Sequence, residues 1–222
     1  MFGYSQSELD VYLGSKKSSN TILMTLDGKT FSELNEDDFF TVFGVRYIKT
    51  HRFSSLQEIQ FLSKQLPIVF RLFETQYDKD LASSLRSKFF NGFDTCCYIR
   101  WISREIGFGA FATKDISEDT IVGEYVGEIK CSLRNSIKHN PFCFHYPTKF
   151  FSWKYYIIDA FHYGNEFRFL NHSDTPNLTR KWVIDRNILH LVFVANEDIP
   201  AHRELTFDYG KHFHEKYLHR ER

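Results

Sequence analysis

The strongest constraint on the fold is a change of sequence pattern near residue 95. Beyond it, short runs of β-branched and aromatic residues alternate with Gly, Pro, Asn and Asp, and the clearest runs span residues 97–102, 120–125, 155–158 and 188–195. Such runs are typical of short strands joined by turns, and not of a parallel sheet built from βαβ units. The sequence therefore predicts a mostly β domain over residues 96–210.

The preceding stretch carries a helical pattern. Apolar residues recur there at spacings of three and four: Leu56, Ile59, Leu62, Leu66, Val69 and Phe73. This spacing predicts an amphipathic helix, and Pro67 is expected to kink it or split it in two. A second helix is predicted over residues 80–90, because Asn91-Gly92 provides a suitable stop signal.

The rest of the N-terminal part has weaker signals. Residues 1–37 combine Ser, Asn, Gly and charged residues, so we expect irregular chain there, with one short strand at residues 21–26. Residues 39–53 are rich in Phe, Val, Tyr and Ile, which favours extended chain. We therefore predict a partly helical accessory region over residues 1–95, with residues 211–222 left as a C-terminal tail.

Composition limits the classes of function. The 222 residues are 42% hydrophobic and 18% aromatic, which is enough to fill a core. Lys+Arg and Asp+Glu both number 28, and neither half of the chain is basic. Because a protein that neutralises nucleic acid phosphates normally shows an excess of positive charge, direct nucleic-acid binding is not expected.

The cysteines do not indicate a metal site. The four of them lack the paired CxxC spacing of zinc sites, and two are adjacent and poorly placed to form a disulfide: Cys96, Cys97, Cys131 and Cys143. We interpret them as reduced structural thiols, and no metal is expected.

The sequence also shows no recognisable targeting signal. The N-terminus shows no basic stretch followed by an apolar run, and no apolar run in the chain is long enough to span a bilayer. We expect a soluble protein that is made in the cytosol and does not engage a membrane. Export into a host cell and its nucleus, without a cleaved signal, stays an open alternative that the Ser-rich start favours only weakly.

Four short stretches concentrate glycines and polar side chains. They are G-F-G at residues 107–109, E-Y-V-G-E at residues 124–128, R-F-L-N-H-S-D-T-P-N at residues 168–177 and E-L-T-F-D-Y-G at residues 204–210. Taken singly, each has a plain structural explanation as a tight turn, an edge of a hairpin, a loop of side-chain hydrogen bonds or the end of a strand. Their order and spacing carry more information than any one of them.

Together these stretches resemble the SET-domain family of protein lysine methyltransferases over about residues 97–210. The third and fourth match the family's most diagnostic motifs almost letter for letter, and the overall impression is of the compact SET proteins of intracellular bacteria such as chlamydiae. The resemblance implies a β-clip fold with a knot-like crossing near its C-terminal end. It also implies S-adenosylmethionine as the cofactor and transfer of its methyl group to lysine.

The resemblance assigns roles to individual residues. Gly107, Phe108 and Gly109 are expected to hold the methionine part of the cofactor. Asn171 and His172 are expected to flank its polar groups and adenine, and Arg168, counted with these cofactor-binding residues, is expected chiefly to brace their loop. Tyr209 matches the catalytic tyrosine, which also borders the cofactor, and Tyr125 matches a second tyrosine of the lysine channel.

Phenols suit this chemistry. The lysine amine attacks only when neutral, yet a free lysine has a pKa of about 10.4. A narrow apolar channel and a nearby sulfonium both disfavour the ammonium form, so tyrosine oxygens and backbone carbonyls need only orient the amine. Phe207, two residues before Tyr209, matches a position where Phe leaves room for a methylated amine, which favours di- or trimethylation.

The chain departs from the family pattern at its C-terminal end. Many members have a zinc-binding cysteine cluster after the D-Y motif, but no cysteine follows Cys143 here. Residues 211–222 are therefore expected to cap or flank the site in another way, with Phe213 or Tyr217 packing over adenine or on the core. The tail histidines His212, His214 and His219 have irregular spacing and are interpreted as a solvated segment, not a metal site.

The substrate is less constrained than the reaction. A basic, histone-like protein or peptide is the default by analogy. A methyltransferase of a non-histone target and a catalytically inactive scaffold with a SET fold are the alternatives. Aromatic residues of the N-terminal part suit either a homodimer face or core packing: Phe39, Phe40, Phe43, Phe89, Phe90 and Phe93.

Overall fold

The computed structural model describes residues 4–14, 21–132, 140–149 and 154–210. The predicted tail, with Phe213, Tyr217 and its three histidines, lies outside the described residues. Strand accounts for 36% and helix for 25% of the structure, which confirms the prediction of a mostly β chain.

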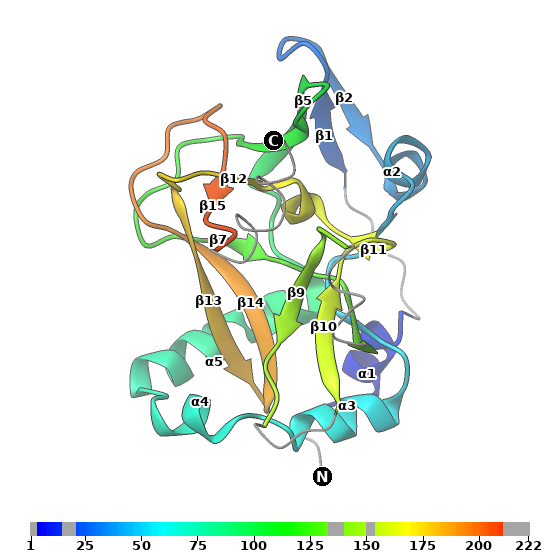
Figure 1. Ribbon diagram of the computed structural model, residues 1–222, viewed down its shortest axis with the longest axis vertical. Helices are drawn as coiled ribbons and strands as arrows, with labels where there is room; N and C mark the ends of the chain where they lie inside the picture. The colour runs from blue at the N-terminus through cyan, green and yellow to red at the C-terminus, as the bar shows by residue number, and fades with distance from the viewer. Residues whose placement is uncertain (1–3, 15–20, 133–139, 150–153, 211–222) are drawn as a thin grey trace, which may run out of the picture.

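The largest sheet has five strands in the order β12-β15-β13-β14-β7 (Figure 1). Their bounds are β7 Ile121–Glu124, β12 Asn171–His172, β13 Leu178–Asp185, β14 Ile188–Ala195 and β15 Thr206–Phe207. The two long strands form an antiparallel hairpin whose two turn residues, Arg186 and Asn187, have φ of 46° and 67°. Left-handed conformations at both positions are typical of a type I′ turn, which matches the twist of the strands it joins.

The described part of the chain also forms three smaller sheets. Their strand orders are β2-β1-β5-β6, β4-β8-β10-β9 and β11-β3. The strands are β1 Ile22–Thr25, β2 Phe31–Leu34, β3 Arg46–Tyr47, β4 Arg52–Phe53, β5 Cys97–Ser103, β6 Gly107–Ala112, β8 Glu128–Ser132, β9 Cys143–Tyr146, β10 Tyr155–Asp159 and β11 Tyr163–Gly164. The four predicted β-type runs after residue 95 all contain strands.

Five α-helices precede β5 in the described part of the chain: α1 Gln6–Tyr12, α2 Glu36–Phe43, α3 Leu56–Ser63, α4 Ile68–Leu72 and α5 Gln76–Asn91. Pro67 stands at the N-cap of α4, so the predicted split of the long amphipathic segment is confirmed. Helix α5 ends as predicted, at Gly92 with φ of 85°, but begins earlier because Thr75 and Asp78 form a capping box. Figure 1 shows α3, α4 and α5 gathered around one end of the β13–β14 hairpin.

Two predictions for the N-terminal part are wrong. Residues 39–43, part of the stretch expected to be extended, lie in α2, because Asn35 and Asp38 make a reciprocal capping box that outweighs the β propensity of the Phe and Val residues. Residues 1–37 also contain more structure than the single strand expected: Ser5 caps α1, and residues 31–34 pair with the predicted strand as β2. Within residues 21–26, β1 confirms that strand.

Strands from the N-terminal part complete sheets of the C-terminal part. Strand β1 pairs in parallel with β5, β3 with β11, and β4 with β8. Backbone pairing therefore crosses the predicted boundary near residue 95, and the division into an accessory region and a catalytic domain stays a prediction. The knot-like crossing also stays a prediction, although β12 and β15 lie side by side as parallel neighbours.

Core packing uses several of the aromatic residues considered for a dimer face. Phe39 and Phe89 are fully buried, Phe90 is 9% exposed, and Phe40 is 49% exposed. The buried three therefore favour the core interpretation. Among the described helices, none combines the length and apolar character needed to cross a bilayer.

Candidate active site

The first motif, residues 107–109, opens strand β6 directly after the turn that follows β5. Gly107 has φ of 81°, and a Cβ atom added there would meet nothing within 4 Å, so the backbone is open on that side. Gly109 is enclosed instead: a Cβ atom would lie 2.7 Å from Ile102 Cδ1, 2.8 Å from Glu204 Oε1 and 3.1 Å from Asn171 Nδ2. The two glycines therefore serve different needs, a left-handed turn and a close approach of backbone to polar side chains.

Asn171 joins three of the four motifs. Its Nδ2 atom donates to the carbonyl oxygen of Phe108 at 3.2 Å and to Glu204 Oε1 at 2.8 Å. Parallel pairing of β12 with β15 places the third and fourth motifs next to each other. The predicted cofactor residues Gly107, Phe108, Gly109 and Asn171 thus lie together.

His172 is oriented by its two neighbours. The backbone N–H of Tyr209 donates to His172 Nδ1 at 3.2 Å, and His172 Nε2 lies 3.2 Å from Asp174 Oδ1. Since a backbone N–H can only donate, Nδ1 is an acceptor, and the neutral ring carries its proton on Nε2. The ring of His172 is also 5.5 Å from that of Tyr209.

Tyr209 is held by the loop that precedes Asn171. Its hydroxyl donates to the carbonyl oxygen of Leu170 at 2.6 Å. Burial, with a smaller contribution from the negative charge of Glu204, raises the pKa of Tyr209 to about 12. The phenol is therefore protonated at neutral pH, and its proton is directed toward Leu170.

A row of aromatic rings connects Tyr125 with Tyr209. The ring centroids of Tyr125 and Phe144 are 4.7 Å apart, those of Phe144 and Phe207 are 5.7 Å apart, and those of Phe207 and Tyr209 are 4.7 Å apart. The Tyr125 hydroxyl donates to the carbonyl oxygen of Phe142 at 3.0 Å, and burial raises the pKa of Tyr125 well above its usual value. The structure thus brings both predicted tyrosines and Phe207 into one apolar cluster.

Residues 107–210, which contain all four motifs, match the SET domain as a protein family. The matched segment is a SET domain. It begins at the glycine turn and ends one residue after Tyr209.

Curated relatives of the SET domain are histone-lysine methyltransferases. The Putative histone-lysine N-methyltransferase 1 of Plasmodium falciparum is 38% identical over 46% of this chain and 2% of its own length. Set8 of Drosophila melanogaster is 33% identical over 51% of this chain and 17% of its own length. EHMT1 of Homo sapiens is 34% identical over 50% of this chain and 9% of its own length. The chain therefore spans less than a fifth of each of these relatives.

One solved structure is similar to part of this chain. The crystal structure of KRYPTONITE in complex with mCHH DNA, an H3 peptide and SAH aligns with 54% of this chain and 24% of its own, at 26% identity and a TM-score of 0.44.

Arg168 braces the SET domain loop from the short 3₁₀ helix η2 (Glu166–Phe169). Its Nε atom donates to the carbonyl oxygen of Ala160 at 3.0 Å, and its guanidinium lies 4.0 Å from the ring centroid of Phe142. Phe142 also accepts the hydrogen bond of Tyr125. These contacts favour the bracing role, while the assignment of Arg168 to the cofactor stays a prediction.

Helix α2 supports the SET domain from the N-terminal part of the chain. The ring of Phe43 lies 5.2 Å from that of Phe108 and 4.8 Å from that of Phe169. Sequence reasoning missed this contact because it treated residues 39–53 as extended. The capping pair Asn35 and Asp38 was the signal that could have revealed the helix.

Sequence reasoning also gave no role to Glu204, Leu170 or Phe144. Glu204 and Leu170 both belong to the recognised motifs. A hydrogen-bonding role for the Glu204 carboxylate could therefore have been predicted from the sequence. The contact with Leu170 uses only a backbone carbonyl oxygen, which has no signature in the sequence. Phe144 lies in the stretch between motifs, where several Phe residues look alike.

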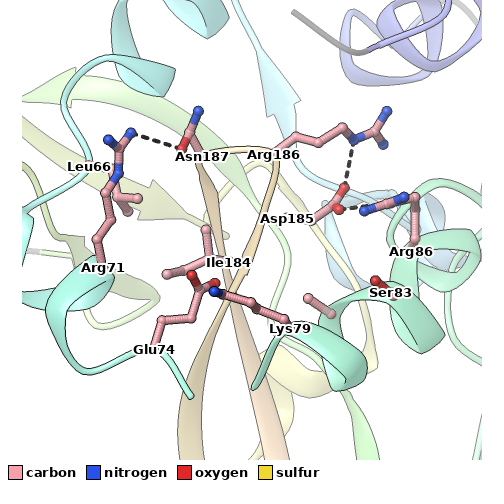
Figure 2. A pocket seen from close by; sticks show the side chains of 11 residues that line it. Leu66, Arg71, Glu74, Lys79, Ser83, Arg86, Ile184, Asp185, Arg186 and Asn187 are labelled. Carbon is pink, nitrogen blue, oxygen red and sulfur yellow. Dashed lines mark hydrogen bonds and ion pairs between the residues drawn. The ribbon is translucent and has the colours of Figure 1, made fainter. Parts of the chain in front are cut away.

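A polar hollow lies beside the turn of the β13–β14 hairpin, at the end where α4 and α5 pack, and Figure 2 shows its lining. It has a volume of about 370 Å³. Asp185 pairs there with Arg86 at 2.9 Å and with Arg186 at 3.0 Å, and Arg71 donates to Asn187 at 2.9 Å. These side chains pair with one another, so we interpret the hollow as a packing interface between α5 and the hairpin turn and not as a ligand site.

Proposed function

We propose that this chain is an S-adenosylmethionine-dependent protein lysine N-methyltransferase. The observation that carries the proposal is the placement of Tyr209, whose hydroxyl is fixed on Leu170 while its backbone N–H is fixed on His172. This arrangement attaches the predicted catalytic phenol at two points to the motif at residues 168–177, whose Asn171 also contacts Phe108 of the glycine motif. The SET-domain relatives, all named as histone-lysine methyltransferases, support the same reaction.

The residues present fit the cofactor. SET methyltransferases use S-adenosylmethionine, which supplies a methyl group activated on a sulfonium. Gly107 leaves its side of the turn open, and Asn171 holds the carbonyl of Phe108 in place beside it. We assign the binding of the methionine part to this turn, and the binding of adenine and polar groups to Asn171 and His172.

The phenols orient the amine without acting as bases. With a pKa of about 12, Tyr209 keeps its proton throughout the neutral range, and that proton points at Leu170. Its oxygen can then accept weak CH···O contacts from the methyl group that is transferred. The apolar ring row disfavours the ammonium form of the lysine, which has a pKa of about 10.4 in water.

Phe207 supports a product beyond monomethyl-lysine. Its ring packs between Phe193 at 5.0 Å and Tyr209 at 4.7 Å and brings no polar atom to this position. A tyrosine there would add a hydroxyl able to hold water against a methylated amine. We therefore propose di- or trimethylation, which mass spectrometry of the product would test; monomethyl-lysine as the sole product would contradict it.

A histone-like basic protein is the proposed substrate class. The support comes from the names of the relatives, and a non-histone target is the alternative. The test is transfer of label from radioactive S-adenosylmethionine to core histones and to a bacterial histone-like protein, comparing the wild type with Tyr209→Phe. Label on lysine that falls steeply in the variant is the expected result.

The second candidate is a scaffold that has lost turnover. Calorimetric titration with S-adenosylmethionine distinguishes the scaffold from an active methyltransferase. Cofactor binding without labelling of the tested proteins means that they are not the substrate, whereas no cofactor binding favours the scaffold. The bacterial subtype, export into a host cell and a homodimer stay predictions from the sequence. Size-exclusion chromatography with light scattering tests the homodimer, and a clean monomer would end that idea.

A further inference from the structure

Three buried titratable side chains meet outside the proposed methyl-transfer site. They are His51, between β3 and β4, Glu124, at the end of β7, and His190, in β14. Their exposed fractions are 1%, 1% and 0%, and one potential ligand atom from each lies within 4.8 Å of the other two. Methyl transfer as proposed above uses none of them, although Glu124 directly precedes Tyr125.

Sheet geometry explains how two of them meet. Strands β7 and β14 are antiparallel, and Glu124 is opposite Val192. Side chains two residues apart on a strand share a face, so His190 lies on the same side of the sheet as Glu124. His51 comes from the N-terminal part of the chain. It immediately precedes β4, the strand that pairs with β8.

Hydrogen bonding leaves this cluster incomplete. His190 Nδ1 lies 2.6 Å from Glu124 Oε1 and is hydrogen-bonded to it. His51 Nε2 lies 3.0 Å from the same oxygen but is not aligned for a hydrogen bond with it. Within the described part of the chain, neither ring nitrogen of His51 nor Glu124 Oε2 has a hydrogen-bond partner. Burying polar atoms in this state is unfavourable unless another group satisfies them.

The donor set suits a zinc ion. Two imidazole nitrogens and one carboxylate are a common protein ligand set for Zn²⁺, and the second carboxylate oxygen can complete the coordination. Ligand atoms at about 2.0–2.2 Å from one zinc ion lie about 3–4 Å apart, so the His190–Glu124 pair has to open slightly to admit it.

Neighbouring aromatic residues hold His190 in a suitable orientation. The Tyr12 hydroxyl lies 3.4 Å from His190 Nε2, and the ring of Phe89 stacks on the imidazole at a centroid distance of 3.8 Å. When Nε2 carries the proton and faces Tyr12, the Nδ1 lone pair is directed toward the cluster. Metal-binding histidines are commonly oriented by such a contact at the second nitrogen.

We propose that His51, Glu124 and His190 bind a structural zinc ion that fastens the segment around His51 to the SET domain behind Tyr125. The sequence alone indicated no metal, because these three residues are 73 and 66 positions apart along the chain and have no local spacing motif. The ion is separate from the proposed methyl transfer, which needs no metal.

The first experiment measures metal directly on the full chain, purified without a histidine tag from zinc-supplemented medium. Inductively coupled plasma mass spectrometry should find about one zinc per chain. Removal of the ion by a chelator should lower the Tm, and added Zn²⁺ should restore it. A folded wild-type protein that contains no zinc, and whose Tm does not respond to Zn²⁺, would overturn the proposal.

Variants then locate the ion. Glu124→Gln preserves the side-chain shape and should lose the zinc, whereas His162→Ala, at an exposed histidine, should keep it. A variant with His212, His214 and His219 all replaced by Ala excludes binding by the tail and should also keep it. Retention of zinc by a folded Glu124→Gln protein would place the ion elsewhere and contradict the assignment.

X-ray absorption of the tail variant covers the case in which Glu124→Gln fails to fold. Two imidazoles and oxygen in the zinc coordination shell support the site, and thiolate ligands would instead assign the ion to cysteines. None of these measurements depends on methyl transfer. A failure of the zinc proposal can therefore be distinguished from a failure of the proposed function.

Discussion

The hydroxyl of Tyr209 donates a 2.6 Å hydrogen bond to the backbone carbonyl oxygen of Leu170, the residue just before Asn171. The predicted catalytic phenol is therefore positioned by the same loop that holds the predicted cofactor residues. Loss of the hydroxyl removes both this tether and the oxygen that we propose faces the transferred methyl group.

Tyr209→Phe should reduce kcat for methyl transfer about 100-fold or more, the size typical of losing one preorganised polar contact in an active site. Affinity for S-adenosylmethionine should change much less, since the backbone contact with His172 is retained. Tyr77→Phe, at a tyrosine that is 69% exposed, is the matched control and should leave kcat unchanged. An unaltered kcat in Tyr209→Phe would remove Tyr209 from the chemistry.

Gly109→Ala should weaken cofactor binding severely. The added methyl group would lie 2.7–3.1 Å from Ile102, Glu204 and Asn171, so the hydrogen bonds of Asn171 would have to break or shift. Gly107→Ala meets no atom within 4 Å but strains a backbone with φ of 81°, so it should cost about 1 kcal/mol of stability. Calorimetry and thermal unfolding of the two variants should separate these effects; equal cofactor affinity in both would contradict the close-approach argument.

Phe43→Ala should raise the KM for S-adenosylmethionine and lower stability by about 3 kcal/mol or less, because Phe43 is only partly buried. The lost ring supports Phe108 and Phe169. Phe40→Ala, on the same helix but 49% exposed, is the control and should affect neither quantity strongly. If both variants bind the cofactor like the wild type, α2 does not support the glycine turn.

Asp78 should contribute stability that depends on pH. A hydrogen bond from Lys181, followed by those from Thr75, lowers the pKa of Asp78 to about 2, against about 3.9 in the unfolded chain. Because the folded-state pKa is the lower one, the contribution is fully present above about pH 4 and is lost as the pH falls toward 2. Solvent screening of this partly exposed pair limits it to about 1 kcal/mol.

Urea unfolding of Asp78→Asn should therefore show lower stability than the wild type at pH 7 and a difference that shrinks toward pH 2. Asp80→Asn, two positions further along α5, leaves the Asp78–Lys181 pair intact and serves as the control. A difference that is constant across this pH range would mean that the ion pair contributes nothing.

Local signals predicted much of the chain correctly. Pro67 splits the amphipathic segment, Gly92 ends α5, and the β-type runs after residue 95 form strands. Each of these features depends on backbone preferences and side-chain alternation within a few residues. Where two local signals competed, as in α2, the capping pair at Asn35 and Asp38 outweighed the β propensity of the aromatic residues.

The sequence by itself determined the strand content, the helix breaks and the motifs that identify the SET domain, because turns, caps and periodic patterns are encoded by neighbouring residues. Only the tertiary structure decided that Phe43 supports Phe108, that Tyr209 is tethered to Leu170, and that His51 meets Glu124 and His190. These contacts join segments that are 39 to 139 positions apart. Their partners are set by how the strands pair and how the core packs, and no local pattern records that choice.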